Sequence, residues 1–493
     1  MKRHKQHTLI LGLIGLTILA LSTGPVFAST FFKTTAGLGG RGLTQENTTV
    51  SLETLPVSVS DCGVAELFVD VNNVTNLYGV DFRLSFDPTV IEVVDMNPGG
   101  NVNIAPEVDT SGSFSPPYTA NFPVRNVVDN FRGTIWYASA STNPTLPAEG
   151  SGHVARFQIR AKTDGDPNFQ FTYIKLSDPN GVEIPATGVI TPGSSVSTSV
   201  VPDLDIIRLD AGTVQLQWPA VNASTVNQYH IYRSTTPYFY ADGSGTQVVT
   251  TVSNPGSGTL TFDDAVLGSV DDNYFYAVRA ECTVPAGSLS APSDQVGKFE
   301  FELYETGRTD YSWIGINLLL DGVTDSADLA AHIEANSNSS VDVISISTWN
   351  ALAQQLDLYL DDPFEPAFNV NIKFPYQIEV DIPGTLSGSV IWAQVGRLPQ
   401  ITDDTYTLYE TNRTDYNWIL QPLDMTTISS TKNLISDIVS NSSGPVGVIS
   451  LSKWNGPAQQ FDVFFPEDNS PSRFGYPYQV EVNVNIGTSV TWP

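Results

Sequence analysis

Hydrophobic and polar residues alternate with a period of two through most of the chain. Residues 65–71 (AELFVDV) and 214–218 (VQLQW) are examples, and such segments place every second side chain on one face of a strand. These segments are short and are separated by Gly, Pro, Asn and Asp, which favour turns. Segments with helical periodicity are scarce. The pattern predicts a mostly β, multidomain protein built as a string of β-sandwiches.

The C-terminal part of the chain contains an internal repeat. The segment YETGRTDYSW, which begins at Tyr304, recurs as YETNRTDYNW from Tyr409, an offset of 105 residues. The Trp-Asn pair at Trp349 recurs at Trp454 with the same offset. A repeat of this length indicates two copies of one structural unit.

We place these copies at residues 301–396 and 403–493. Each contains one segment with a helical pattern of apolar residues, flanked by strand-like segments. The apolar positions are Leu329, Ala330 and Ile333 in the first copy and Leu434, Ile435 and Ile438 in the second. Each copy is therefore expected to be a small, β-rich α+β domain with one helix. The copies resemble a repeat of secreted multidomain proteins from filamentous bacteria such as Chloroflexota, and this resemblance implies no particular activity.

Residues 50–200 contain strand patterns in a defined order. Val80, Phe82 and Leu84 alternate towards a core, and a following Asp-Pro pair ends their strand. In order and spacing the domain resembles a cohesin. The segments that carry this resemblance are residues 69–73, 77–88, 90–94, 133–137 and 152–157. The resemblance implies a jelly-roll-like β-sandwich of nine strands, related to carbohydrate-binding modules.

The cohesin resemblance also implies a binding surface. In cellulosomes, cohesins bind the helical dockerin of a partner protein. The resemblance implies that the dockerin-facing aspartate is Asp81, and alternation along the strand places Arg83 on the same outer face. The family's contacts on the strand after Trp136 fall on Ala138 and Ser141. These four residues are the expected partner-binding site.

Residues 201–300 resemble a fibronectin type III domain. Trp218 occupies the position of the core tryptophan on the second strand, and Tyr274 that of the tyrosine corner on the sixth. The resemblance implies a second β-sandwich, and modules of this family usually act as spacers.

Charge and the N-terminal sequence narrow the location and the partners. Among 493 residues, 52 Asp and Glu outnumber 23 Lys and Arg, so the net charge is −29. Such a chain repels phosphate backbones and anionic lipids, which excludes nucleic acid and anionic membrane surfaces as partners.

Basic residues, an apolar segment and a small-residue pattern ending at Ala28 make residues 1–28 a signal peptide, followed by a flexible leader at 29–49. No later segment is apolar enough to span a membrane, so we expect a secreted, extracellular or cell-surface protein.

Paired carboxylates are the strongest hint of catalysis. Glu305 with Asp310, and Glu410 with Asp415, occur at equivalent places in the two copies. An arginine lies between the members of each pair. We therefore interpret them as salt-bridged turns rather than as the acid and base of a glycoside hydrolase.

Other candidate chemistry is weak. Cys62 and Cys282 are far apart in the sequence, and we expect two isolated thiols in different domains, neither a disulfide nor a metal site. Asp321, Asp325 and Asp328 fit a helix N-terminus better than a calcium loop. The chain contains no nucleophile, metalloprotease or phosphate-loop motif. We expect no enzyme activity, no cofactor and no bound metal.

The tryptophans of the repeats have two interpretations. Their recurrence at alternating positions favours a core role, whereas exposed and coplanar Trp349 and Trp454 would form carbohydrate-binding platforms.

Together these observations predict an exported, non-catalytic, modular surface protein that binds or scaffolds through its cohesin-like domain. The partner would be a dockerin-like protein or a polysaccharide. The alternatives are a carbohydrate-binding adhesin and a structural envelope or sheath component that self-assembles.

Overall fold

The computed structural model describes residues 47–53, 59, 61–97, 114–143, 145–190, 195–198, 200–245, 247–307, 310–360, 366–384, 387–401, 405–411, 416–484 and 488–493. They belong to one compact unit, Asn47–Pro493. The expected signal peptide and the leader up to residue 46 lie outside the described residues. No helix in the described part of the chain is long and apolar enough to cross a bilayer.

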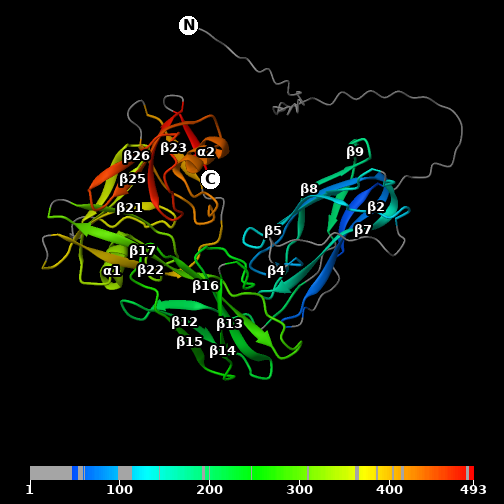
Figure 1. The fold of residues 1–493 in the computed structure, drawn as a ribbon, viewed down its shortest axis with the longest axis horizontal. Helices are drawn as coiled ribbons and strands as arrows, with labels where there is room; N and C mark the ends of the chain where they lie inside the picture. Colours follow the sequence, from blue (N-terminus) through cyan, green and yellow to red (C-terminus); the bar gives the residue numbers. More distant parts are fainter. Residues whose placement is uncertain are drawn as a thin grey trace, which may run out of the picture. The chain divides into compact units, whose positions relative to one another are not determined.

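The prediction of a mostly β protein with several sheets is confirmed (Figure 1). The first sandwich consists of two five-stranded sheets, ordered β10-β1-β2-β7-β4 and β5-β6-β3-β8-β9. Its strands are β1 (Thr49–Glu53), β2 (Ala65–Leu77), β3 (Gly79–Ser85), β4 (Ile91–Val94), β5 (Phe122–Asp129), β6 (Thr134–Ala140), β7 (Ala148–Ala161), β8 (Gln170–Ser177), β9 (Glu183–Ile184) and β10 (Thr187–Ile190). The described part thus has one strand more than the nine implied by the resemblance, and β9 is only two residues long. Val80, Phe82 and Leu84 point into the core as their alternation predicts.

The second sandwich follows directly. One sheet has the order β11-β12-β15, and the other has the order β14-β13-β16-β17-β22. Its strands are β11 (Asp205–Arg208), β12 (Val214–Pro219), β13 (Val226–Ser234), β14 (Val248–Ser253), β15 (Thr259–Asp264), β16 (Tyr274–Cys282), β17 (Val296–Glu305) and β22 (Gly388–Arg397). Trp218 is buried in this core, 5.6 Å from the ring of Tyr229.

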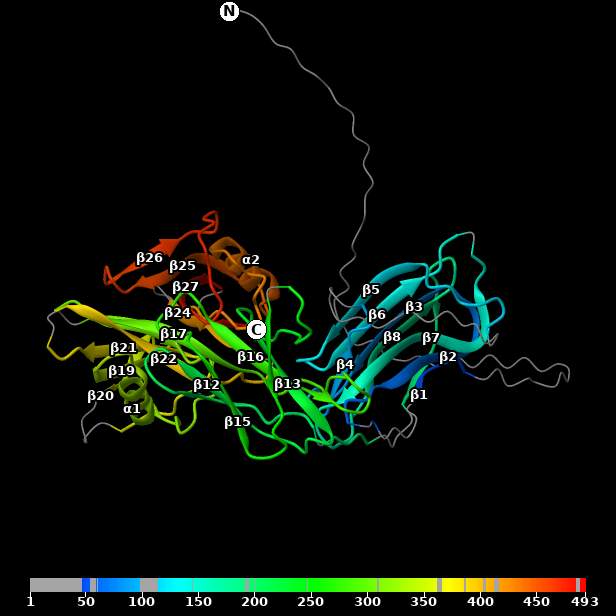
Figure 2. The same ribbon diagram turned by 60° about the horizontal axis from the view of Figure 1, so that its bottom comes forward.

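Strand β17 joins the second sandwich to the first repeat copy. Its first residues pair with β16, and its whole length pairs with β22, which comes from the repeat (Figure 1 and Figure 2). The domain boundary expected between residues 300 and 301 falls inside this strand. Seven of the ten residues of β17 are buried, and the buried polar residues Lys298 and Glu300 show that the strand is covered on both faces although its sequence alternates.

The two repeat copies have the same order of elements. The first contains the end of β17, then β18 (Tyr311–Gly315), α1 (Ser326–Asn336), β19 (Asp342–Asn350), β20 (Gln355–Leu360), β21 (Pro375–Asp381) and β22. The second contains β23 (Tyr406–Tyr409), β24 (Tyr416–Leu420), α2 (Thr431–Asn441), β25 (Gly447–Asn455), β26 (Gln460–Phe464), β27 (Pro477–Asn483) and β28 (Ser489–Trp492). The four-stranded sheets are β18-β21-β19-β20 and β24-β27-β25-β26. The apolar residues expected on the inner face of each helix are all buried.

The two copies pack against each other through reciprocal contacts. Trp313 stacks on its counterpart Trp418, with ring centroids 3.4 Å apart and planes inclined by 13°. The indole of Trp349 donates to the Tyr416 carbonyl, 2.7 Å away. Trp454 makes the same bond to the Tyr311 carbonyl, also at 2.7 Å. Two equivalent glutamines bind the same two tyrosine backbones. The pair therefore has the self-complementary character of a two-fold dimer within one chain.

This packing requires the copies to differ at one position. Gly315 and Leu420 are equivalent and lie opposite each other at the seam. A Cβ atom on Gly315 would stand 2.2 Å from a Leu420 methyl carbon. One copy must therefore carry a glycine where the other carries a leucine.

Gly315→Leu should lower the free energy of unfolding by about 1–3 kcal/mol or more, because it overpacks the seam. The exchange Gly315→Leu with Leu420→Gly should recover most of this loss, because it swaps the two sides of the contact. Thermal unfolding of both variants measures the effect. A double variant no more stable than the single one would contradict the two-fold packing.

Cys62 and Cys282 form a disulfide, so the expectation of isolated thiols was wrong. The pairing is invisible in the sequence because 220 residues separate the two cysteines. The fold brings the turn before β2 to the end of β16, with the Cα atoms 6.1 Å apart. The bond joins the first sandwich to the second and is characteristic of oxidising compartments.

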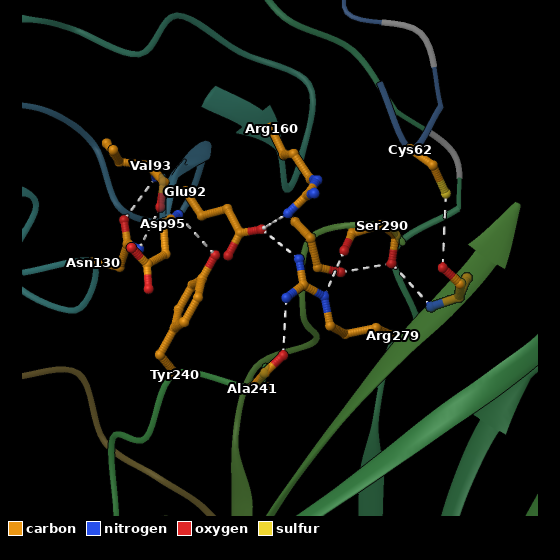
Figure 3. Close-up of polar contacts among 12 residues, drawn as sticks. Cys62, Glu92, Val93, Asp95, Asn130, Arg160, Tyr240, Ala241, Arg279 and Ser290 are labelled. Carbon is orange, nitrogen blue, oxygen red and sulfur yellow. Dashed lines mark hydrogen bonds and ion pairs between the residues drawn. The ribbon is translucent and has the colours of Figure 1, made fainter. Parts of the chain in front are cut away.

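A buried ion cluster lies near this disulfide (Figure 3). Arg279 donates to Glu92 at 2.7 Å, and Arg160 donates to the same carboxylate oxygen at 3.2 Å. Arg279 also donates to the carbonyls of Ser290 and Ala241. Glu92 is 2% exposed and Arg279 3%. Burial is the largest single influence and lowers the pKa of Arg279, but Glu92 together with Tyr240 and Tyr232 raises it by more, so the pKa stays above its ordinary value.

Glu92→Ala should lower the free energy of unfolding by about 3–5 kcal/mol, because it leaves the Arg279 charge buried and unpaired. The control is Glu66→Ala, which removes a 3.1 Å ion pair with the half-exposed Arg156 and should cost no more than about 1 kcal/mol. Denaturant unfolding of both variants makes the comparison. Equal losses would show that the buried cluster contributes no more than a surface pair.

Candidate functional site

The candidate site is the outer face of the sheet β5-β6-β3-β8 in the first sandwich (Figure 2). Alternation along β3 turns Asp81 and Arg83 outward, opposite to the core residues between them. Arg83 lies in register with Trp136 on β6 and Tyr173 on β8. The register therefore places one arginine between two aromatic side chains.

Cationic and aromatic side chains alternate across this face. The guanidinium carbon of Arg83 lies 4.0 Å from the centre of the Trp136 ring and 5.0 Å from that of Tyr173. Arg125, on β5, lies 4.7 Å from the same Trp136 ring. The four residues form a row across four strands, Arg125–Trp136–Arg83–Tyr173, which we call the cation–π row. Each such contact is worth about 0.5–1 kcal/mol at an exposed site.

Asp81 fixes the orientation of this row. The indole Nε1–H of Trp136 donates to Asp81 Oδ1 at 3.1 Å. Asp81 lies opposite Ala138 on one side and Lys175 on the other. The carboxylate therefore holds the tryptophan ring in place while its remaining lone pairs stay open to a ligand.

The face is locally cationic in an acidic protein. Arg83, Arg125 and Lys175 stand among the strands β5, β3 and β8, whereas the chain as a whole carries −29. Two apolar side chains of β5 are exposed beside them, Phe122 at 55% and Val124 at 63%. Arginine, aromatic and exposed apolar residues on one face are the composition enriched in protein interfaces.

Ala138 and Ser141 contribute less surface than expected. Both are buried. Ser141 lies just after β6, where its hydroxyl donates to the Thr119 carbonyl at 2.9 Å. Asp81, Arg83 and Ala138 are thus neighbours on one face. Ser141 instead holds the loop that contains Thr119, at the end of β6. A partner-binding role for these residues remains a prediction.

Three residues of the site, Trp136, Arg125 and Tyr173, were not predicted from the sequence. A usable signal was present, because Trp136 precedes Ala138 by two residues and therefore shares its face. Arg125 and Tyr173 required the strand register, which the sequence alone does not give.

The proposed carbohydrate platforms Trp349 and Trp454 lie half-buried at the seam of the repeats. Each donates its indole N–H to a backbone carbonyl of the other copy, as described above. They are therefore bound into the seam rather than displayed as free platforms.

The paired carboxylates bind backbone donors. Glu305 accepts from the Ile382 N–H at 2.6 Å, and Glu410 accepts from the Val484 N–H. Asp310 accepts from the backbone and hydroxyl of Thr306. Its counterpart Asp415 and the arginines between the pairs lie outside the described residues. These contacts explain the carboxylates structurally.

The Asp-rich segment before α1 is a helix start. Asp325 caps the helix by accepting two backbone N–H bonds, and Asp328 accepts from Thr324. Within the described ranges no group of three or more His, Cys, Asp or Glu residues is arranged to hold a metal ion.

Comparison with known families identifies this domain. The cohesin domain family matches residues 63–196, which contain all four expected site residues. The cohesin resemblance is confirmed for this part of the chain. Cohesin domains are non-catalytic, protein-binding scaffold modules. No curated protein matches the chain.

Several solved cohesins are similar to this chain. A type II cohesin domain from the cellulosome of Acetivibrio cellulolyticus is 14% identical, with 30% of this chain and 95% of that one covered and a TM-score of 0.25. A type I cohesin–dockerin complex from Clostridium thermocellum is 14% identical, with 32% and 100% covered and a TM-score of 0.22. A type I cohesin from Pseudobacteroides cellulosolvens is 16% identical, with 31% and 92% covered and a TM-score of 0.22.

Arg83→Ala should lower the free energy of unfolding by about 1–2 kcal/mol, because it removes two of the three contacts of the cation–π row. Asp81→Ala should lower it by less, because the freed indole N–H reaches water at this half-exposed position. Denaturant unfolding followed by tryptophan fluorescence measures both. A larger loss for Asp81→Ala than for Arg83→Ala would make Asp81 the structural centre of the face.

Proposed function

We propose that the chain is an exported, non-catalytic surface protein whose cohesin domain captures a dockerin-like protein partner on the outer face of β5-β6-β3-β8. The observation that carries this proposal is the cation–π row with Asp81 bound to Trp136. Trp, Tyr and Arg are the residues that most often dominate the binding energy of protein interfaces.

The geometry of the row favours tight binding. Its side chains are already held by one another, so little rotamer entropy remains to be lost when a partner docks. The face belongs to a sheet, which positions side chains more firmly than a loop. Exposed Phe122 and Val124 supply the apolar area that a partner would cover.

The charge of the face indicates the chemistry of the partner. Three cations and one carboxylate occupy its centre, so an acidic partner surface would be complementary. Association should therefore slow as the salt concentration rises. A dependence of the association rate on salt concentration distinguishes a charged protein partner from a neutral polysaccharide.

The remaining domains fit an extracellular scaffold. The basic, apolar and small-residue pattern of residues 1–28 supports export, and the Cys62–Cys282 disulfide supports an oxidising environment. The second sandwich and the repeats would then hold the cohesin domain away from its point of attachment.

Binding is tested by surface plasmon resonance of the full chain over immobilised dockerin modules, including the dockerin of the Clostridium thermocellum complex. We expect at least one module to bind, and Arg83→Ala and Asp81→Ala to weaken that binding at least about tenfold, because each removes a charged contact. Arg156→Ala is the control, because Arg156 lies on β7 in the opposite sheet. Binding that is lost equally in all three variants, or in none, would place the partner elsewhere.

A further inference from the structure

A cavity of about 300 Å³ lies at the seam between the two repeat copies. Strand β17 of the first copy forms one wall, the hairpin β25–β26 and the start of β27 form another, and Val270 and Asp271 of the second sandwich close one end. All residues that line the cavity are among the described ones. Its volume is at the lower end of the range for small-molecule sites.

The cavity is aromatic and charged. Five aromatic residues line it: Phe301, Tyr304, Trp313, Trp454 and Tyr476. Its two cations are Lys453 and Arg473, and its four carboxylates are Asp271, Glu300, Glu302 and Asp462. Glu300 is paired with Lys298 and Asp271 with Arg473, so Glu302 and Asp462 supply the acceptors. Aromatic faces combined with a few convergent polar groups are typical of sites for small hydroxylated ligands.

One hydrogen-bond donor in the cavity wall has no partner. The indole Nε1 of Trp313 is buried without an acceptor, and the residue is 8% exposed. By contrast, the indoles of Trp349 and Trp454 at the same seam each have a carbonyl acceptor. A buried donor left unpaired costs about 1–3 kcal/mol, so an acceptor supplied by a ligand would recover this energy.

Lys453 is a second donor that lacks an acceptor. In the described part of the chain it makes no hydrogen bond or ion pair, and its ammonium lies 5.1 Å from the centre of the Tyr476 ring. Burial and then the nearby charge of Arg473 lower its pKa, while Asp462 and Asp271 oppose the shift. Arg473 itself is bound to Asp271 at 2.9 Å. Lys453 is therefore the cation in this cavity that is available to a ligand.

The two-fold arrangement of the copies supplies an internal comparison. The other side of the seam has the same aromatic framework, but three charged residues of the cavity have neutral counterparts there, whereas Asp462 is matched by Asp357. The pairs, each with the cavity residue first, are Glu302 and Thr407, Lys453 and Thr348, and Arg473 and Asn371. The equivalence holds in the structure, because Asn371 and Arg473 each donate their backbone N–H to the tyrosine hydroxyl five residues later. The fold of the repeat therefore does not require these charges.

We propose that this cavity binds an acidic sugar residue, a uronic acid, through its carboxylate and one face of its ring. The carboxylate would accept from Lys453 and from the Trp313 indole, the two donors that lack partners. The ring hydroxyls would donate to Glu302 and Asp462, and an aromatic side chain would cover the apolar face of the ring. The ligand class follows from these donors, since a neutral sugar would leave the Lys453 charge unpaired.

The test is isothermal titration calorimetry of the full chain with trisaccharides of galacturonic and glucuronic acid, each beside its neutral counterpart. We expect the uronic acid sugars to bind at least about tenfold more tightly than the neutral ones. Lys453→Thr should abolish that difference, and it should fold because the first copy already has Thr348 at the equivalent position. Lys432→Thr, at an exposed position of α2, is the matched control and should bind as the wild type does.

Lys453→Met serves as a second variant that keeps the length of the side chain without its charge, and thermal unfolding confirms that each variant is folded. Equal binding of acidic and neutral sugars would overturn the proposal. So would unchanged uronic acid binding in a folded Lys453 variant, or no binding of either uronic acid by the wild type.

Discussion

The pairing of β17 with two strands at once joins the second sandwich to the first repeat copy. Its first residues complete a sheet of the second sandwich, and its full length forms a ladder with β22 of the first repeat copy. A ladder of ten residues cannot open at one end without exposing backbone donors and acceptors at the other. Lys298 and Glu300 are buried on this strand as a 2.5 Å ion pair. Neighbouring domains therefore share a strand instead of touching across a linker, and the seam cavity has one rigid wall.

Local patterns predicted the elements of this fold, whereas long-range pairing had to be observed. Alternation gave the inward face of β3, and apolar spacing gave the buried faces of both helices. The boundary expected between residues 300 and 301 falls inside β17, because the continuation of this strand depends on its pairing with β22, which lies far along the chain. The disulfide was missed because nothing local distinguishes a paired cysteine from a free one.

The candidate site was also predicted only in part, because a local pattern describes one strand and not its pairing with other strands. Asp81 and Arg83 lie on one strand, where the period of two determines which side chains share a face. Trp136 and Tyr173 complete the row only through the registers of β6 and β8 against β3. The seam cavity could not be predicted from the sequence, since it depends on the relative placement of three segments. The repeat in the sequence nevertheless held its main clue, namely the charged positions at which the two copies differ.

The glycine at position 315 has a consequence for the behaviour of the protein at high concentration. Two leucines facing each other at the seam would clash, and two glycines would leave a void. A copy with glycine at this position therefore packs best against a copy with leucine. Two molecules that exchanged their second copies would satisfy this rule as well as one molecule does. Domain-swapped dimers would therefore preserve the packing of the seam. The short connection between β22 and β23 keeps the correct partner at a high effective concentration and so favours the monomer in dilute solution.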